Sequence, residues 1–223
     1  MSFIESVNIG VASPIDAKSG FSAIDKRPVE VAVAVSAPGP KGLGGSGLAG
    51  DEICDKPNHG GDDQAVYAYA REDLDRWQAD LGRPLRSGSF GENLTTTGVD
   101  VNGALVGERW RIGAELVLQV TVPRVPCRTF AVWLGEQGWV KTFTRRAIPG
   151  AYLRVVRPGE VRRGDSVVVE HRPDHDVSVG LVFRALTIEP ELLPRLLVAD
   201  DLPDEAKDRA RRRLPFDLMS EPD

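Results

Sequence analysis

The sequence predicts a mainly β fold with some α-helix: a closed, antiparallel-rich β-barrel with flanking helices, followed by a small C-terminal three-helix domain. Short runs of alternating apolar and polar residues recur along most of the chain, and glycine-rich turns separate them. Few segments in this part have helical spacing. After a polar segment at 172–176 the pattern changes to three short helical stretches. We therefore expect a β-barrel domain over residues 1–172 and a helical domain over residues 177–215.

The strands are expected first at 3–11 and 28–36, where valines alternate with small residues. The segment 39–50 is almost all glycine, proline and small residues, which favours a flexible surface loop. Asp63 is a suitable cap for a helix running to about residue 80, because apolar residues follow it at helical spacing. A glycine-bracketed turn at 88–95 then leads into a strand.

The second half of the predicted barrel contains the clearest alternation. Strands are expected at 105–112, 115–122, 150–156 and 165–170, helices at 130–134 and 140–146, and a turn at 159–164. The C-terminal helices are expected at 177–186, 191–199 and 204–214, with Pro190 and Pro203 near the starts of the last two. Three short helices also suggest a helix-turn-helix, but the basic run near the end has acidic neighbours and argues against DNA binding.

Composition limits the classes of function. Of the 223 residues, 41% are hydrophobic and 27% are charged, which is ordinary for a globular protein. The net charge of −5 argues against broad binding to nucleic acid or to an anionic membrane, and no apolar run is long enough to cross a bilayer. The N-terminus does not resemble a signal peptide, and only Cys54 and Cys127 are available for disulfides. We expect a cytoplasmic protein without nucleic-acid or membrane partners, and a homodimer remains an open alternative.

The loop after residue 122 is the strongest chemical signal. Pro123 and Pro126 forbid a regular helix and a central strand, so they stiffen an extended loop that presents Cys127 between Arg124 and Arg128. Neighbouring positive charge favours the thiolate, which is the form that attacks electrophiles or binds metal. A buried structural cysteine is an equally good interpretation of this stretch alone.

Other polar segments have a functional and a structural interpretation. The glycines after His59 let the backbone turn sharply or approach a ligand, and the imidazole could donate to an anion. The Lys26–Arg27 pair is typical of a solvated turn at the start of a strand. Glu92 and Asn93 could fix their turn or face a ligand. The other histidines lie far along the chain, so a three-histidine zinc site is not expected.

Taken together, these segments resemble the MOSC family, named for the C-terminal domain of molybdenum cofactor sulfurase. The matching segments stand in the family's order over residues 1–171: Lys26-Arg27-Pro28-Val29, Gly50-Asp51, His59-Gly60-Gly61, Gly88 to Leu94, Pro123 to Cys127, Tyr152 to Val155, and Gly164-Asp165. The C-terminal helices resemble the three-helix extension of the bacterial YiiM-like branch. Gly107-Glu108 departs from the more usual Gly-Asp, and the loop 39–48 is extended.

The resemblance implies a MOSC-type barrel that holds a molybdopterin-type molybdenum cofactor, with Cys127 as the protein ligand to the metal. It implies cofactor contacts from Lys26, Arg27, Arg124 and Arg154, which would bind the pterin phosphate, and from His59 and Asn93. The YiiM-like branch implies a detoxifying reductase of N-hydroxylated compounds such as hydroxylamino-purines, with His59 as a proton donor. Its electrons would come from a partner reductase, because the sequence has no dinucleotide fingerprint and too few cysteines for an iron–sulfur cluster.

Two other functions remain open at this point. The first is a sulfur-relay or molybdenum-cofactor carrier, in which Cys127 would carry a persulfide or the pocket would hold cofactor for delivery. The second is a non-enzymatic interaction module, which would leave the candidate cations dispersed over the surface. Cys54 is not expected to bind metal in any of these, because an adjacent carboxylate disfavours its thiolate.

Overall fold

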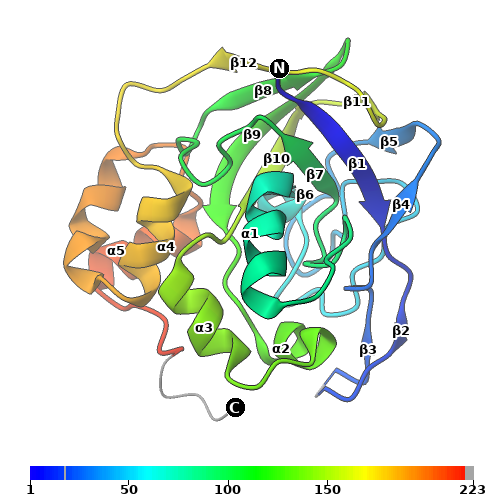
Figure 1. Cartoon of the computed structure of the whole chain (residues 1–223). Helices are drawn as coiled ribbons and strands as arrows, with labels where there is room; N and C mark the ends of the chain where they lie inside the picture. Colours follow the sequence, from blue (N-terminus) through cyan, green and yellow to red (C-terminus); the bar gives the residue numbers. More distant parts are fainter. Residues whose placement is uncertain (18, 219–223) are drawn as a thin grey trace.

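The computed structural model describes residues 1–17 and 19–218, which form a mixed α/β fold (Figure 1). Its main sheet has eight strands in the order β12-β8-β9-β10-β6-β7-β1-β4, and two further sheets pair β11 with β5 and β2 with β3. Along the chain the elements are β1 (Phe3–Ile9), β2 (Ser13–Pro14), β3 (Phe21–Ser22), β4 (Arg27–Val29), β5 (Val33–Val35), η1 (Asp62–Gln64), β6 (Val66–Ala70), α1 (Arg71–Leu81), β7 (Leu94–Thr97), β8 (Arg109–Ile112), β9 (Leu116–Pro123), α2 (Arg128–Leu134), α3 (Trp139–Arg146), β10 (Ala151–Arg157), β11 (Gly159–Val161), β12 (Val167–His171), α4 (Val179–Thr187), η2 (Pro190–Val198) and α5 (Asp204–Arg212). None of the helices described is long and apolar enough to cross a membrane.

The closed barrel expected from the sequence is wrong, because the main sheet is open and mixed. Its edges are β12 and β4, and β6 pairs with β7 in parallel while the other neighbours are antiparallel. The start of β1 meets the chain before β12 through one isolated bridge, Phe3 to Ser166, and three backbone hydrogen bonds around it. That contact is too short to form the ladder that would close the sheet.

The helix expected from Asp63 begins only at Arg71. Residues 66–70 are instead the central strand β6, and all five of its residues are buried. A strand that is covered on both faces reads as a continuous apolar run, and periodicity alone does not separate such a run from a buried helix. Similarly, the strand expected at 28–36 is split into β4 and β5 with Val31 exposed between them, and the turn expected at 159–164 contains β11.

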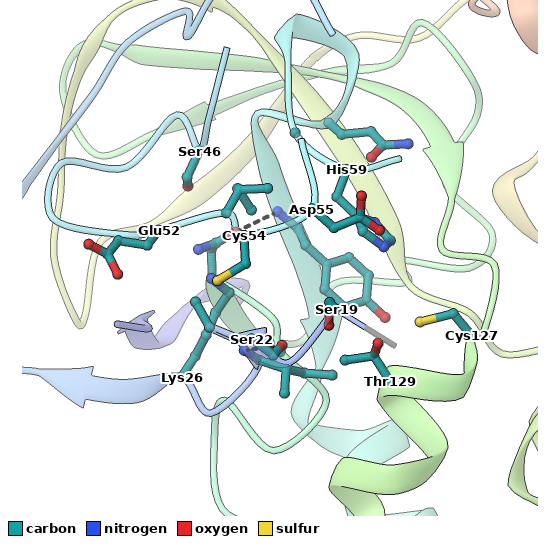
Figure 2. A pocket seen from close by; sticks show the side chains of 18 of the residues that line it. Ser19, Ser22, Lys26, Ser46, Glu52, Cys54, Asp55, His59, Cys127 and Thr129 are labelled. Atoms are coloured by element: carbon teal, nitrogen blue, oxygen red, sulfur yellow. Dashed lines mark hydrogen bonds between the residues drawn. The ribbon is translucent and has the colours of Figure 1, made fainter. Parts of the chain in front are cut away.

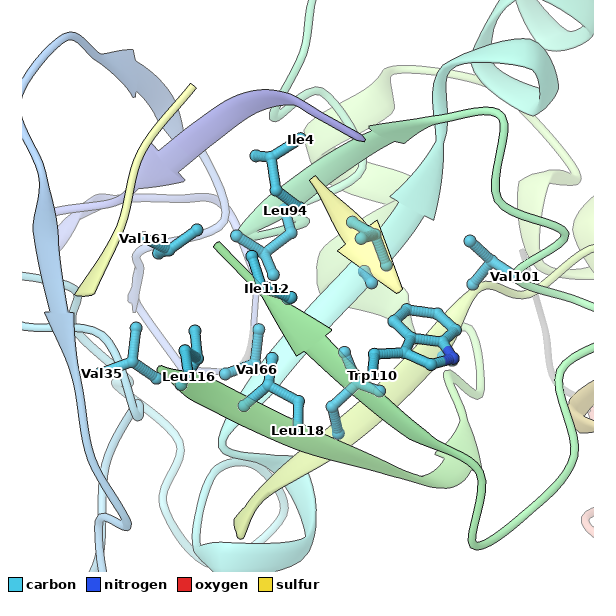
Figure 3. Packing of buried hydrophobic residues seen from close by; sticks show 14 of the residues in the cluster. Ile4, Val35, Val66, Leu94, Val101, Trp110, Ile112, Leu116, Leu118 and Val161 are labelled. Atoms are coloured by element: carbon cyan, nitrogen blue, oxygen red, sulfur yellow. The ribbon is translucent and has the colours of Figure 1, made fainter. Parts of the chain in front are cut away.

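Two hydrophobic clusters pack the sheet and the helices α1 to α3. Aliphatic side chains of the sheet and Trp110 form the first, which Figure 3 shows between the strands. The second is aromatic, and in it Phe90, Phe130, Trp139 and Phe143 pack with ring centroids 5.1–6.1 Å apart. It lies among α1, α2 and α3, so it fixes the start of α2, which follows Cys127 directly.

The C-terminal helices pack on the preceding part of the chain through a third cluster. Leu181, Leu186, Leu193 and Leu196 meet Val106 of that part there. Phe183 of α4 joins the aromatic cluster instead, with its ring centroid 6.2 Å from that of Phe143. Of the expected helices, the middle one is the 3₁₀ helix η2, in which Pro194 removes one backbone donor. The two-domain division itself remains a prediction.

A pair of glycine variants should separate backbone strain from steric collision. Gly82 and Gly88 both have positive φ, but a Cβ at Gly82 meets nothing within 4 Å, whereas one at Gly88 collides with the backbone oxygen of Lys26. We expect Gly82→Ala to lower the free energy of unfolding by about 1 kcal/mol and Gly88→Ala by about 3 kcal/mol. Urea denaturation of both variants measures this. Equal losses would show that the 88–92 turn is not held against Lys26.

Candidate functional site

Cys127 lies where two hollows of the surface meet. It is the N-cap residue of α2, and the buried ring of Phe130 anchors the first turn of that helix. We call the smaller hollow, of about 100 Å³, the inner cavity; Lys26, Cys54, Tyr67, Asn93 and Arg124 are among its lining residues. The larger, of about 1020 Å³, is the outer cleft, and its lining includes the 122–129 loop, Lys41 and residues of the C-terminal helices. The residues that line both are Asp55, His59, Gly60, Gln64, Cys127, Thr129 and Tyr152.

The environment of the Cys127 thiol favours its ionised form. Figure 2 shows the sulfur pointing into the pocket, with His59 and Thr129 on either side. Burial raises the pKa of the thiol, but a hydrogen bond from His59, the charge of Arg124 and the backbone N–H of Phe130 together lower this pKa from 9.0 to about 7. About half of the thiol is therefore thiolate at neutral pH. Arg128, its neighbour in sequence, is exposed and lines the outer cleft.

Arg124 is a buried cation at the wall of the inner cavity, with 7% of its surface exposed. It donates to the carbonyl oxygen of Phe90, and its guanidinium carbon lies 4.2 Å from the ring centroid of Phe130 and 5.2 Å from that of Tyr67. Among the described residues it has no carboxylate partner. A buried charge needs a counter-charge, and the groups available here are the Cys127 thiolate or an anionic ligand.

Lys26 and Asn93 also line the inner cavity, but both already have protein partners. Lys26 forms an ion pair with Asp51, whose side chain is fully buried, and burial lowers the pKa of Lys26 while Asp51 opposes that shift. Asn93 donates to the other Asp51 oxygen at 2.9 Å and accepts from the backbone N–H of Tyr67 at 3.1 Å. These residues therefore build the cavity floor, and the charge of Lys26 is largely balanced.

Arg27 and Arg154 are not brought to the cavity. Arg27 is exposed on the edge strand β4 and pairs with Asp25 at 2.6 Å. Arg154 pairs with Asp63 at 2.6 Å and lines neither hollow. The candidates that do come together at the inner cavity are Lys26, His59, Asn93, Arg124 and Cys127.

Two pocket residues were missed by the sequence reasoning. Tyr152 lines both hollows, and burial raises the pKa of its phenol, which therefore keeps its proton at neutral pH. It belongs to the same motif as Arg154; the core positions of Ala151 and Leu153 could have indicated that Tyr152 faces away from the sheet core. Gln64 also lines both hollows, and its Oε1 is buried without a hydrogen-bond partner. No pattern in the sequence marks this glutamine.

Two conspicuous motifs also support the site through contacts behind its lining. Glu92 accepts hydrogen bonds from the N–H groups of Gly88 at 2.5 Å and Phe90 at 3.0 Å, so it fixes the turn. Gly60, at φ +77, packs so closely that a Cβ there would lie 2.7 Å from the oxygen of Gly45. The glycines after His59 thus seat its loop on the glycine-rich segment.

Cys54, the second cysteine, also lines the inner cavity but has the opposite electrostatic environment. It is exposed, and burial of its sulfur together with the charge of Glu52 raises the pKa of its thiol. The direction matches the sequence-based expectation, although the carboxylate responsible is Glu52 rather than the adjacent Asp55. Figure 2 shows the two sulfur atoms on opposite sides of the pocket.

The thiol environment can be tested by alkylation. In a Cys54→Ser background, the rate of iodoacetamide alkylation should rise with pH around a midpoint near 7, since only the thiolate reacts. His59→Ala should move this midpoint upward by roughly one unit because the thiolate loses a hydrogen bond. His171→Ala, on the strand β12, serves as the control and should leave the midpoint unchanged. A midpoint near 9 in the parent protein would contradict this geometry.

Comparison with known proteins identifies the family of the chain. A model of the MOSC domain matches residues 55–168, about half of the chain. The protein YflK of Bacillus subtilis strain 168 is 34% identical over 181 residues, which cover 80% of this chain and 78% of YflK. A protein of Gibberella moniliformis named Reductase is 29% identical over 184 residues, which cover 78% of this chain but 32% of that larger protein.

The fold resembles a solved structure over almost its whole length. The crystal structure of YiiM from Geobacillus stearothermophilus superimposes with a TM-score of 0.76, covering 96% of this chain and all of that one at 24% sequence identity. At this identity the likeness concerns the fold alone. Because the family model and the similarity to YflK together extend over most of its length, the chain belongs to the MOSC domain family.

Proposed function

We propose that the protein is a molybdenum-cofactor-dependent oxidoreductase that reduces N-hydroxylated compounds of the hydroxylamino-purine type in the cytoplasm. The observation that carries this proposal is the Cys127 thiol, which has a pKa of about 7 and lies between a small cavity and a large cleft. Membership of the MOSC family and the similarity to a protein named Reductase support it.

The residues around Cys127 fit a molybdopterin-type cofactor. A thiolate is a soft ligand that suits a thiophilic metal, and the lowered pKa of Cys127 favours this form before any metal binds. Arg124 offers a buried positive charge without a carboxylate partner among the described residues. The unpartnered Oε1 of Gln64 could accept a hydrogen bond from an N–H donor of the pterin. The cation set is narrower than the sequence predicts, because Arg27 and Arg154 pair elsewhere.

When bound, the cofactor would supply two-electron redox chemistry and a position that accepts the oxygen of the substrate. Cys127 would hold the metal, and Arg124 would stabilise the negative charge that the thiolate and the pterin phosphate bring. His59 donates to the sulfur and lines the outer cleft, so its imidazole could hold a proton near the leaving oxygen. Overall, R–NHOH gains two electrons and two protons and becomes R–NH₂ and water.

The electrons are proposed to come from a separate reductase. The chain has no dinucleotide fingerprint, and its two cysteines are too few for an iron–sulfur cluster. The Gibberella moniliformis protein named Reductase is about three times the length that this chain covers in it. In that larger protein, the region similar to this chain is joined to further sequence. This arrangement is compatible with an electron donor that is a separate protein for the present chain.

A sulfur-relay or cofactor-carrier function is the second candidate. The observation that favours it is the same thiolate, because a persulfide carrier also needs an ionised sulfur in an accessible position. Metal and pterin analysis of protein purified from a cofactor-competent host separates the two. Close to one molybdenum per chain that survives dialysis supports the enzyme, whereas labile or substoichiometric molybdenum supports the carrier.

The two cysteines should differ sharply in turnover. We expect Cys127→Ser to abolish reduction of an N-hydroxylated purine, because the metal loses its protein ligand, whereas Cys54→Ser keeps most of the activity. Molybdenum and pterin content are measured alongside, since Arg124 and Gln64 can retain cofactor without the thiol. Normal turnover by Cys127→Ser would overturn the metal-ligand assignment.

The purified chain should not use NADH directly. With NADH alone we expect no reduction of a hydroxylamine above the rate without protein, while a reduced dye such as methyl viologen should support turnover. The comparison is made on one preparation of known molybdenum content. Brisk NADH oxidation coupled to substrate reduction by the chain alone would refute the need for a partner reductase.

A further inference from the structure

The outer cleft connects the thiol to the C-terminal helices. Its thiol end contains Cys127 and His59, and its far wall contains Leu186 of α4, the first turn of α5 and Phe216. The first turn of α5 also reaches the opposite side, because Glu205 forms an ion pair with Lys41 at 2.7 Å. A volume of about 1020 Å³ is within the range of small-molecule sites.

Much of the lining of this cleft is apolar and conformationally stiff. Pro123 and Pro126 line it on the side of the thiol loop, and Pro203, Leu186 and Phe216 line it on the C-terminal side. An apolar lining favours an apolar ring, because binding removes the apolar surface of both from water. Proline side chains also lose little conformational entropy when a ligand binds against them. The wall is therefore better suited to a flat apolar face than to an extended polar chain.

Arg209 and Phe216 form a stacked pair in this wall. The guanidinium carbon of Arg209 lies 3.8 Å from the ring centroid of Phe216, and both residues line the cleft. The backbone N–H of Phe216 donates to the oxygen of Leu186 at 2.6 Å, which holds the ring in place. Within the described chain no carboxylate forms an ion pair with Arg209; the hydrogen bond of its Nη1 to the Leu214 oxygen is long, at 3.5 Å. Its N–H donors thus remain available to a ligand.

The charges of the wall select against an anionic ligand. Asp204 and Glu205 line the cleft on the same helix as Arg209, and Asp62 and Asp63 line it near the thiol end. Glu205 is paired with Lys41 and Asp63 with Arg154, and Arg128 also lines the cleft. The repulsion of a phosphate at Arg209 would therefore come mainly from Asp204 on the same helix and from Asp62. A neutral ring nitrogen or carbonyl oxygen can accept a hydrogen bond from Arg209 without this repulsion.

We propose that the Arg209–Phe216 stack holds the ring of a neutral, flat nitrogen heterocycle, and that the same molecule presents its N–OH group at the Cys127 end of the cleft. The proposal rests on the proposed function for the identity of the reacting group. It assigns substrate selection to the C-terminal helices and predicts preference for the free base over the corresponding nucleotide.

The test is a binding experiment that needs no turnover. The fluorescent base 2-aminopurine is titrated with the full-length Cys127→Ser protein and with the same protein carrying Phe216→Leu, Arg209→Lys or Arg212→Lys. Phe216→Leu keeps an apolar side chain but removes the flat face, and Arg209→Lys keeps the charge but removes the plane. Arg212→Lys, on the same helix but outside the cleft lining, is the matched control.

We expect the dissociation constant to rise on the order of tenfold for Phe216→Leu and for Arg209→Lys, and to stay unchanged for Arg212→Lys. Cyclohexylamine, which has no flat ring, should not displace 2-aminopurine. The ribonucleoside monophosphate of 2-aminopurine should bind more weakly than the free base. The proposal is overturned if the parent protein does not bind the base, if both cleft variants bind it as well as the parent, or if the nucleotide binds more tightly. Thermal melting checks whether the Phe216→Leu variant is folded. If that variant does not fold, the Arg209→Lys variant alone tests the stack.

Failure of this test and failure of the proposed function give different results. Without molybdenum chemistry the protein would not reduce any hydroxylamine, but it would still bind the base through the stack. If instead only the stack proposal is wrong, the protein would still reduce N-hydroxylated substrates. In that case Arg209→Lys and Phe216→Leu would leave both KM and base binding unchanged.

Discussion

The burial of Arg124 is the constraint on which the site depends. A guanidinium removed from water carries a penalty of several kcal/mol unless hydrogen bonds, ring faces and a counter-charge compensate it. Here the carbonyl of Phe90, the rings of Phe130 and Tyr67 and the Cys127 thiol do so. These groups come from the 88–92 turn, α2, β6 and the loop before α2. The fold must therefore bring four separate segments together before the cation is compensated.

The low pKa of Cys127 is in this sense a property of packing. Glu92 fixes the turn that aims the Phe90 carbonyl, and the Phe90 ring lies 5.1 Å from that of Phe130. Phe130 in turn anchors the helix that begins after Cys127 and supplies the N–H that reaches the sulfur. Arg128, which is nearer in sequence than Arg124, does not contribute because it is exposed on the outer cleft. Sequence adjacency to a cation is a weaker guide than burial beside one.

The sequence predicted most elements of the fold, and its main failures are the strand β6 and the expected closure of the sheet. β10 was predicted from its alternation of buried and more exposed residues. β9 was predicted from the alternation of polar with apolar residues, although all but one of its residues are buried, and α4 was predicted from its apolar spacing. β6 was predicted as helix because it is covered on both faces, and the sheet was expected to close because strand patterns carry no information on how far edges pair.

The same limit applies to the site. Lys26, His59, Asn93, Arg124 and Cys127 were expected at the site from the resemblance to the MOSC family. The residues alone marked Cys127 by its prolines and arginines and His59 by the glycines after it, whereas Lys26 looked like part of a solvated turn. The placement of Arg27 and Arg154 depends on whether a carboxylate lies nearer than the cavity, and Asp25 and Asp63 supply one in each case. Such competition between partners is decided in three dimensions. Gln64 and Tyr152 escaped notice because their residue types are common and only their position at the junction is special.

The arrangement separates the control of reactivity from the control of access. The groups that set the pKa of Cys127, namely His59, Arg124 and Phe130, all precede the C-terminal helices in the chain and lie near the thiol. Phe216 packs against a different hydrophobic cluster, Arg209 stacks on its ring, and both line only the outer cleft. Substitutions distant from one another and without shared partners act nearly independently on free energy. The far wall can therefore change with the molecule to be accommodated while the thiol keeps its ionisation, because no charged group on that wall is needed to compensate Arg124.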